Sequence, residues 1–301
     1  LLSNTTGTRN IAIGNNAYDN ADTENDNLAI GYDALGGAID GGEYNVAIGN
    51  YSLDANTSGD HNTAVGYNGL TANTTGTSNT ASGANSLVDN TTGQLNDAHG
   101  VFSLGDNTTG DYNVALGSSS LRYNTTADGN TAIGYTALRE ANRTADSDGF
   151  NTAVGYNAGN TNTNDITTGN KNTLLGASTA ASDAAGTNQT VIGYGASGKD
   201  DNTVTIGNGD ITLWSAADDG EVDLGSSSVE FKDLYIDGVA YTDALGFGTV
   251  AMTLPTADGS ANQVLKTDGS GTLSWTTASG ASAINDLSDA LIEDNSIYIG
   301  N

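Results

Sequence analysis

Apolar residues are sparse in this chain, but they recur at fixed spacing. The phrase Asn-x-Ala-Ile/Val/Leu-Gly, or a close variant of it, returns along residues 10–207. Most of its steps are 17 residues long, two steps are 21 residues long, and the last step is 14. Such a period indicates a stack of equivalent units, each of which covers the next. The glycines that close the phrases are Gly14, Gly31, Gly49, Gly66, Gly83, Gly100, Gly117, Gly134, Gly155, Gly176, Gly193 and Gly207.

A second apolar position, a leucine, follows many of these glycines by four residues. A polar cluster such as Asn73-Thr74-Thr75-Gly76 comes next. Gly and Asn tolerate the positive φ of tight turns, so we interpret this cluster as a corner. The unit therefore predicts a short strand, a corner, a second short strand and a second corner. The leucines are Leu35, Leu53, Leu70, Leu87, Leu104, Leu121 and Leu138.

This unit favours one coil of a parallel β-solenoid, also called a β-roll. The pattern lacks the 3.6-residue periodicity of a helix, and its Gly and β-branched residues argue against one. In a solenoid each strand pairs with its copies in the coils above and below, about 4.8 Å away. We predict an all-β chain in which residues 1–207 form a shaft of 17-residue coils.

Two columns of side chains should follow each predicted strand. Alternation places the Ala of each phrase on one face and the Ile, Val or Leu on the other. Because both columns are apolar, we expect both to be buried. A slender coil has one interior, so the second column needs a partner, and self-association is the simplest source. The Asn that opens each phrase, from Asn10 to Asn172 with Gln189 in the same place, should form an amide ladder along the axis.

Ser82 and His99 interrupt the Ile column on adjacent coils. One interpretation is an axial polar layer, in which His side chains of several chains bind water, an anion or a metal. A single imidazole type without carboxylate support is weak evidence for a metal site. We therefore favour a tolerated polar lapse in the column.

Composition and charge narrow the function classes. The net charge is −28, with 36 acidic and 8 basic residues, so a nucleic acid is not an expected partner. No apolar run reaches the roughly 20 residues of a membrane-spanning helix, so we expect no membrane insertion. The lack of Cys excludes disulfides and Cys-based metal sites. We expect no metal and no cofactor.

The stacked Asn-x-Ala-Ile-Gly phrase resembles the head domain of trimeric autotransporter adhesins of the YadA type. The resemblance covers about residues 4–207. It implies a left-handed β-roll and a homotrimer, in which three chains surround one axis. The units of that family are shorter than those of this chain, so the match in period is incomplete.

The remainder of the chain resembles segments of bacteriophage tail fibres. The resemblance lies in residues 224–238, in Leu254-Pro255-Thr256-Ala257-Asp258-Gly259, and in residues 263–275. The last of these segments predicts a β-hairpin around Asp268-Gly269. We expect residues 208–278 to form a small β-rich connector module. Residues 279–301 should be a short linker and the start of a further repeat block, as in a segment of a longer fibre.

These observations favour a structural role. Our first hypothesis is an extracellular, homotrimeric tail-fibre shaft of a virion that contributes to attachment to a host-cell surface. Its partners would be copies of itself, other fibre or tail proteins, and a host glycan or protein. The alternative is a bacterial cell-surface adhesin or extracellular filament subunit of the trimeric autotransporter kind. A polysaccharide depolymerase ranks third, because the carboxylates lie in turn phrases and no catalytic pair is evident, so we expect no enzyme.

The two 21-residue steps supply the candidate receptor site. Insertions in solenoids form loops on one face, and here they lengthen residues 139–150 and 160–170. They also bring together the densest basic residues of an acidic chain, so we expect neighbouring loops that bind a glycan or partner, with plain decoration as the alternative. Asp146-Ser147-Asp148-Gly149 lacks the spacing of a calcium-binding EF-hand loop, which favours a solvated turn. The receptor-binding candidates are Arg139, Arg143, Asp146, Asp148, Phe150 and Lys171.

Overall fold

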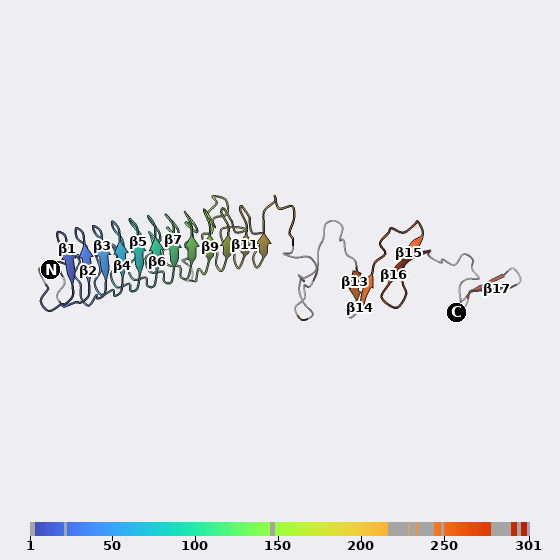
Figure 1. The fold of residues 1–301 in the computed structure, drawn as a ribbon, viewed down its shortest axis with the longest axis horizontal. Coiled ribbons are helices and arrows are strands. Elements are labelled where there is room, and N and C mark those ends of the chain that lie inside the picture. Colours follow the sequence, from blue (N-terminus) through green and yellow to red (C-terminus); the bar gives the residue numbers. More distant parts are fainter. Residues whose placement is uncertain are drawn as a thin grey trace. The chain divides into compact units, whose positions relative to one another are not determined.

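The computed structural model describes residues 4–20, 23–144, 148–215, 228, 233, 244–247, 250–277, 290–293 and 296–299. Two parts of the chain are compact by themselves, residues 1–215 and residues 216–301. The first part is a parallel β-solenoid with no helix in its described residues (Figure 1). The predicted fold class is therefore confirmed.

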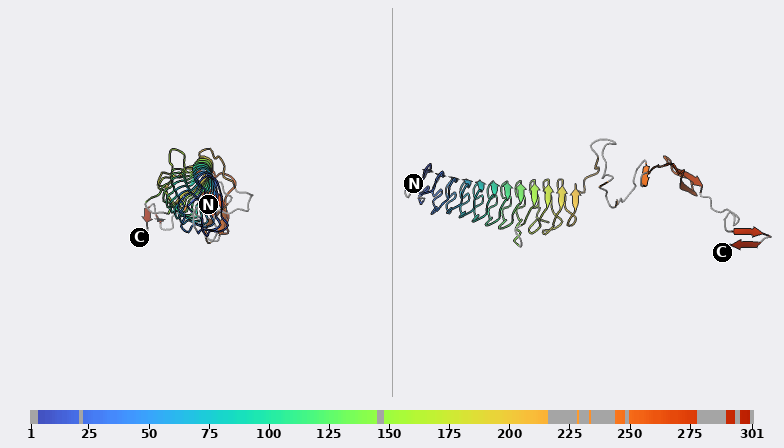
Figure 2. Two further views of the ribbon diagram at one scale, coloured as in Figure 1. Left: turned by 90° about the vertical axis from the view of Figure 1, so that its left-hand side faces the viewer. Right: turned by 90° about the horizontal axis from the view of Figure 1, so that it is seen from below.

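Twelve strands of three residues each form one parallel sheet, in which every strand lies beside the next one in sequence (Figure 2). Equivalent residues stand opposite each other, as Ala64 does with Ala81. The register holds through both long steps, because Thr152 pairs with Thr131 on one side and Thr173 on the other. The strands are β1 (Ile11–Ile13), β2 (Leu28–Ile30), β3 (Val46–Ile48), β4 (Thr63–Val65), β5 (Thr80–Ser82), β6 (Asp97–His99), β7 (Val114–Leu116), β8 (Thr131–Ile133), β9 (Thr152–Val154), β10 (Thr173–Leu175), β11 (Thr190–Ile192) and β12 (Val204–Ile206).

The second strand predicted in each coil is wrong, because the leucine segment forms a turn. All seven leucines of this column, from Leu35 to Leu138, have a left-handed backbone with φ between 48° and 52°. That conformation costs roughly 1 kcal/mol for a residue with a Cβ. It persists because each leucine side chain fills the interior of its coil and is fully buried. Each coil therefore has one strand, and turns and bends complete it.

The solenoid interior holds the alanines and the leucines. In a three-residue strand the middle side chain points away from the face that its two neighbours share. From β2 to β9 the middle residue is an alanine with no exposed surface, as at Ala64 and Ala81. The two flanking side chains face outward and remain half-buried or exposed. Of the two columns expected to be buried, only the alanine column is buried within the single chain.

Glycine closes each strand because the coils approach too closely for a Cβ. Gly83 has φ of 145°, a conformation that L side chains rarely adopt. A Cβ on Gly83 would lie 2.5 Å from the carbonyl oxygen of Gly100 in the next coil. At the corner, a Cβ on Gly110 would lie 2.6 Å from both the Ala127 carbonyl oxygen and Asn107 Oδ1. Close stacking, and not turn geometry alone, therefore requires these glycines.

The amide ladder predicted along the axis is confirmed. Asn96 Nδ2 donates to Gly110 O at 2.8 Å and to Asn79 Oδ1 at 3.2 Å. Asn96 Oδ1 accepts from the backbone N–H of Asn113 at 3.0 Å. Each buried amide thus satisfies backbone groups of the turn and of the neighbouring coil. The ladder ends at Gln189, whose Nε2 donates to Ser182 Oγ at 2.6 Å.

The corner asparagines form a second ladder. Asn90 Nδ2 donates to Asn73 Oδ1 at 2.9 Å and to Gly93 O at 3.1 Å. Neither Asn73 nor Gly76 is among the described residues with positive φ, so our explanation of this corner by positive φ is wrong. These asparagines are selected instead as fully buried side chains that hydrogen-bond the corner carbonyl and the next coil. Other members of the ladder are Asn56, Asn107 and Asn124.

The second part of the chain contains three antiparallel hairpins: β13 (Ala244–Phe247) with β14 (Val250–Thr253), β15 (Gln263–Thr267) with β16 (Leu273–Thr277), and β17 (Ala290–Glu293) with β18 (Ser296–Ile299). The hairpin predicted around Asp268-Gly269 is confirmed. Asp268 Oδ1 accepts the backbone N–H groups of Ser270 at 2.7 Å and Thr272 at 3.0 Å. These bonds stabilise the carboxylate and lower the pKa of Asp268.

Two glycines of one coil make it possible to distinguish the steric effect of close stacking from the general effect of replacing a glycine. Gly66 has φ of 141°, and its Cβ would lie 2.5 Å from Gly83 O. We expect Gly66→Ala to lower the free energy of unfolding by about 2 kcal/mol or more. At Gly69 a Cβ would make ordinary contact with Ala64 at 3.5 Å, so Gly69→Ala should be neutral or stabilise by up to about 1 kcal/mol. Urea denaturation followed by circular dichroism measures both, and equal losses would contradict the stacking explanation.

The amide ladder predicts a large cost for losing one rung. Asn96→Ala leaves the Gly110 carbonyl and the Asn113 N–H without their buried side-chain partner. We expect the free energy of unfolding to fall by about 2–4 kcal/mol, since each orphaned group costs about 1–3 kcal/mol. Thr75→Ala, at an exposed position of the corner, is the control and should change it by less than about 0.5 kcal/mol. Thermal unfolding measures the stability of both variants. Equal losses of stability in the two variants would contradict the role of the ladder.

Candidate functional site

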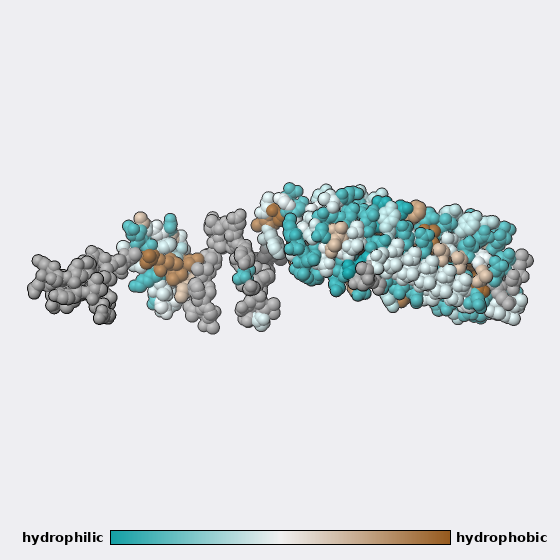
Figure 3. Space-filling model, turned by 180° about the vertical axis from the view of Figure 1, so that it is seen from behind, coloured by the Kyte–Doolittle hydropathy of each residue, from teal (hydrophilic) through white to brown (hydrophobic). Residues whose placement is uncertain are grey.

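The outward face of the strands carries an apolar column that the described residues of the solenoid leave at least partly exposed. The third residue of each strand makes this column. Several of its members are 40–59% exposed, and its remaining Ile and Val residues are half-buried. Figure 3 shows a mostly hydrophilic solenoid surface with scattered apolar patches. The most exposed members are Ile13, Val65, Leu116, Leu175 and Ile206.

Tyrosines border this apolar column. Tyr32 and Tyr51 meet edge to face at 5.3 Å between ring centroids, and Tyr51 meets Tyr67 in the same way at 6.0 Å. Further along, Tyr135 and Tyr156 stack at 5.7 Å. Aromatic pairs at such distances stabilise each other and order the rings. The bend after the strands therefore presents ordered aromatic surface.

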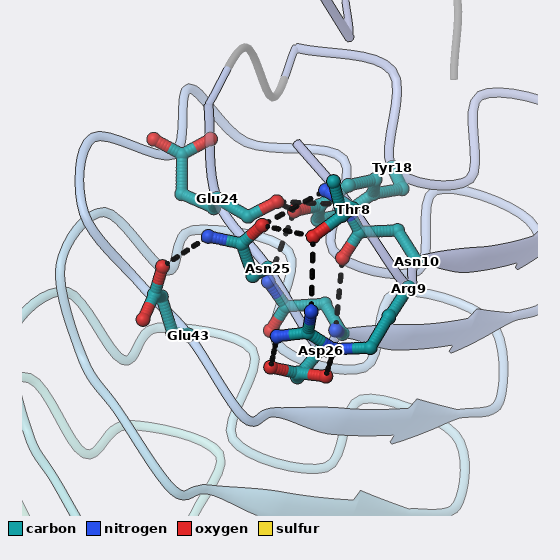
Figure 4. A network of polar contacts seen from close by, with 9 residues as sticks. Thr8, Arg9, Asn10, Tyr18, Glu24, Asn25, Asp26 and Glu43 are labelled. Carbon is teal, nitrogen blue, oxygen red and sulfur yellow. Dashed lines mark hydrogen bonds and ion pairs between the residues drawn. The ribbon is translucent and has the colours of Figure 1, made fainter. Parts of the chain in front are cut away.

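A polar network ties the first coils together (Figure 4). Arg9 contacts the Asp26 carboxylate through Nε at 2.5 Å and Nη2 at 2.6 Å. The hydrogen bond from Arg9 lowers the pKa of Asp26. Beneath them, Tyr18 is buried and its hydroxyl accepts from Asn27 Nδ2 at 2.9 Å. Burial raises the pKa of Tyr18 to about 12. The Arg9 guanidinium is thereby anchored within the fold on the Asp26 carboxylate.

The two residues of the suggested polar layer lie on the outward face of adjacent strands. Ser82 of β5 stands opposite His99 of β6. His99 Nε2 lies 2.8 Å from Asp97 Oδ1, so the imidazole does have a carboxylate beside it, which the sequence interpretation overlooked. Asp97 and His99 are the two outward residues of one strand, and their side chains are 50% and 42% exposed. The pair forms one polar rung across the apolar column.

The two insertion loops contact each other, as predicted. The backbone N–H of Asn142 donates to Thr167 O at 2.7 Å, and Arg143 Nη1 donates to Thr168 O at 2.6 Å. These contacts join the loop before β9 to the loop before β10. Asp146 lies outside the described residues.

The other candidates near these loops lie beside the strands. Asp148 is exposed and forms a parallel bridge with Asp128. Phe150 is 49% exposed, and its ring packs against Gly129, where a Cβ would lie 2.5 Å from Cδ1. Lys171 is exposed, and its backbone N–H donates to Gly149 O at 2.9 Å. Phe150 and Lys171 therefore occupy one column, immediately before β9 and β10.

Arg139 belongs to a different cluster. Its Nη2 donates to the Tyr123 hydroxyl at 2.8 Å, and its guanidinium lies 4.9 Å from the Tyr123 ring centroid. Its Nη1 also lies 3.6 Å from Glu140 Oε1. The structure pairs Arg139 with the preceding coil.

Sequence reasoning missed the central member of this cluster, Arg122. Its guanidinium lies 4.4 Å from the Phe102 ring centroid and 5.2 Å from that of Tyr123. The signal was present in the repeat, because Arg122 and Arg139 each follow the column leucine of their coil. A comparison of residues at the same position of successive coils would have identified this pair of arginines. We call Phe102, Arg122, Tyr123 and Arg139 the arginine–aromatic cluster.

Other chemistries lack a site in the described part of the chain. There, no three His, Asp, Glu or Cys side chains gather as a metal site would require. The same residues include no helix that could cross a membrane. What the described surface offers is an apolar column, two contacting loops and the arginine–aromatic cluster.

No protein-family model matches this chain, and no curated protein sequence matches it either.

Proposed function

We propose that this protein is a structural shaft of an extracellular fibre, a homotrimer that contributes to attachment to a host-cell surface, as a bacteriophage tail fibre does. The observation that carries the proposal is the outward apolar column of a rigid, otherwise polar solenoid. Exposed apolar surface of this extent marks an interaction site. The resemblance of the sequence to trimeric adhesin heads is the basis for three chains, and its resemblance to tail fibres is the basis for a virion fibre.

The size of the strand face suits a stable interface. Twelve stacked strands span roughly 53 Å at about 4.8 Å per step. The outward residues and the bordering tyrosines cover about five positions, or about 15 Å at about 3.3 Å per residue. The product, about 800 Å², equals one partner's share of a standard interface.

The distribution of charge also favours burial of this face. Twelve strands with two outward residues each give 24 outward positions. Only Asp97 among them is acidic and none is Lys or Arg, although the chain contains 36 acidic residues. Asp97 itself has His99 beside it. Charges are depleted at the cores of interfaces because their desolvation is costly.

A second copy of the chain is the occupant that matches this face best. Its column has the same spacing, so side chains of two copies stay in step along the whole shaft. A partner without this axial spacing of about 4.8 Å would fall out of step within a few coils. A rod assembled in this way would be stiff and would hold attachment sites in several identical copies, which raises avidity.

The assembly is tested by placing charge in the column. Native mass spectrometry of the full chain should show a trimer, and Leu116→Glu should convert it to monomers, because three carboxylates would then meet in a dry interface. Thr75→Glu, which adds the same charge at an exposed corner, should leave the trimer intact.

The fold of each variant is followed by circular dichroism. If Leu116→Glu does not fold, Leu116→Ser replaces it, since the same column already accepts Ser82. A monomeric wild-type chain, or a trimer that survives both Leu116 variants unchanged, would contradict the proposal.

A further inference from the structure

We infer that the arginine–aromatic cluster is a binding site for an acidic sugar, a carboxylate-bearing residue within an otherwise neutral surface glycan. This inference rests on the proposed attachment function and names the site and the ligand class. The site lies on three consecutive coils, with Phe102 on the first, Arg122 and Tyr123 on the second, and Arg139 on the third.

The aromatic rings hold the two guanidinium groups in place. Arg122 stacks against both Phe102 and Tyr123, and Arg139 stacks against Tyr123 while donating to its hydroxyl. These are all the cation–π contacts in the described residues. A guanidinium stacked on a ring keeps its N–H groups, which lie in its own plane, available at the edge. The cluster therefore fixes two forks of donors one coil apart, about 5 Å along the axis.

Arg122 has unused hydrogen-bonding capacity. Its Nε is buried and has no hydrogen-bond partner. Arg9 provides the contrast, since Asp26 accepts from both its Nε and its Nη2. A buried donor without a partner costs about 1–3 kcal/mol. An acceptor that binds with a shift of the Arg122 side chain would give this N–H a partner and remove that cost.

At the cluster, the sequence differs from the sequence of the neighbouring coils. Phe102 has φ of 57°, at a position that Asn85 and Ser119 occupy in the neighbouring coils. The left-handed backbone belongs to the repeat, since Asn85, Ser119 and the bulky Tyr51 share it. The departure at Phe102 is therefore the aromatic ring and not the backbone. Gly105 leaves space beside the cluster: a Cβ there would lie 3.7 Å from Phe102 Cδ1 and 3.8 Å from Arg122 Cγ. The preceding coil has Val88 at that phase.

The charge of the chain selects the ligand. Guanidinium forks match carboxylates bidentately, and aromatic side chains with few placed polar groups line small-molecule sites. A net charge of −28 repels an extended polyanion at long range. An isolated carboxylate among neutral sugars avoids that repulsion and still reaches both arginines.

Two carboxylates of the chain oppose binding: Glu140, with Oε1 3.6 Å from Arg139 Nη1, and Asp106 near Arg122. Burial of Asp106, and next the negative charge of Asp89, raise the pKa of Asp106. The positive charge of the nearby Arg122 lowers this pKa by less, so the pKa is raised overall. Arg122 therefore does not neutralise Asp106 fully. Removing the Asp106 charge should strengthen the site, whereas a purely structural Arg122–Asp106 pair predicts the opposite.

The test uses the full chain and an immobilised tetrasaccharide of one glucuronic acid and three neutral hexoses. Its control is the same tetrasaccharide with the carboxyl group reduced to a hydroxymethyl group. Surface plasmon resonance should show binding to the acidic form that is at least about tenfold tighter, the factor that about 1.4 kcal/mol gives.

Four variants assign the binding to the cluster. Arg122→Gln should lose at least about tenfold in affinity, and Arg122→Lys should lose nearly as much, because Lys keeps the charge without the fork. Asp106→Asn should gain about threefold. Lys199→Gln, which removes one exposed positive charge elsewhere, should bind like the wild type. Circular dichroism verifies the fold of each.

The outcomes separate this inference from the proposed function. A trimer that binds the acidic and reduced sugars equally, or that binds neither, overturns the site and leaves the shaft proposal standing. Equal binding by Arg122→Gln and wild type also overturns it. A chain that is monomeric by native mass spectrometry overturns the shaft proposal, whatever the sugar result.

Discussion

The close stacking of backbone from coil to coil is the constraint on which the rest of this structure depends. Adjacent coils lie about 4.8 Å apart, the spacing of hydrogen-bonded strands. At that distance a side chain on Gly83 would collide with the carbonyl group of Gly100. The same distance brings each buried Asn within reach of the amide one coil away, so that a ladder can satisfy turn carbonyls that no strand would pair. Sterics and polar satisfaction therefore select Gly and Asn together.

A coil of 17 residues with one three-residue strand encloses little volume. Alanine from the strand and leucine from the turn fill it, and the left-handed leucines show that the packing outweighs their backbone cost. From β2 to β9 the interior accepts only an alanine from each strand, and the larger Ile, Val and Leu residues of these strands face outward. The thin core thus explains why an acidic, polar chain exposes an apolar column, and why we look for its partner in a second copy.

The repetition also gives meaning to the residues that depart from it. Phe102 stands where the neighbouring coils have Asn85 and Ser119, and Arg122 follows Gly105 at its own position. Stacking places Arg122 against Phe102 and Tyr123, and Arg139 against Tyr123. The insertion loops likewise meet because their coils are adjacent. On a regular scaffold such departures stand out, since the interior positions are already committed to stacking.

The sequence by itself determined the solenoid, its period, its register and the amide ladder, because each depends on residues that recur at the same phase. It also determined the hairpin at Asp268-Gly269 through local turn chemistry. Only the tertiary structure decided that the leucine segment is a turn, since a left-handed Leu contradicts local preference and is held by packing. Likewise, the period places Arg122 and Arg139 at equal positions of adjacent coils but does not encode the direction of their side chains. Only the structure shows that both guanidinium groups lie against the Tyr123 ring.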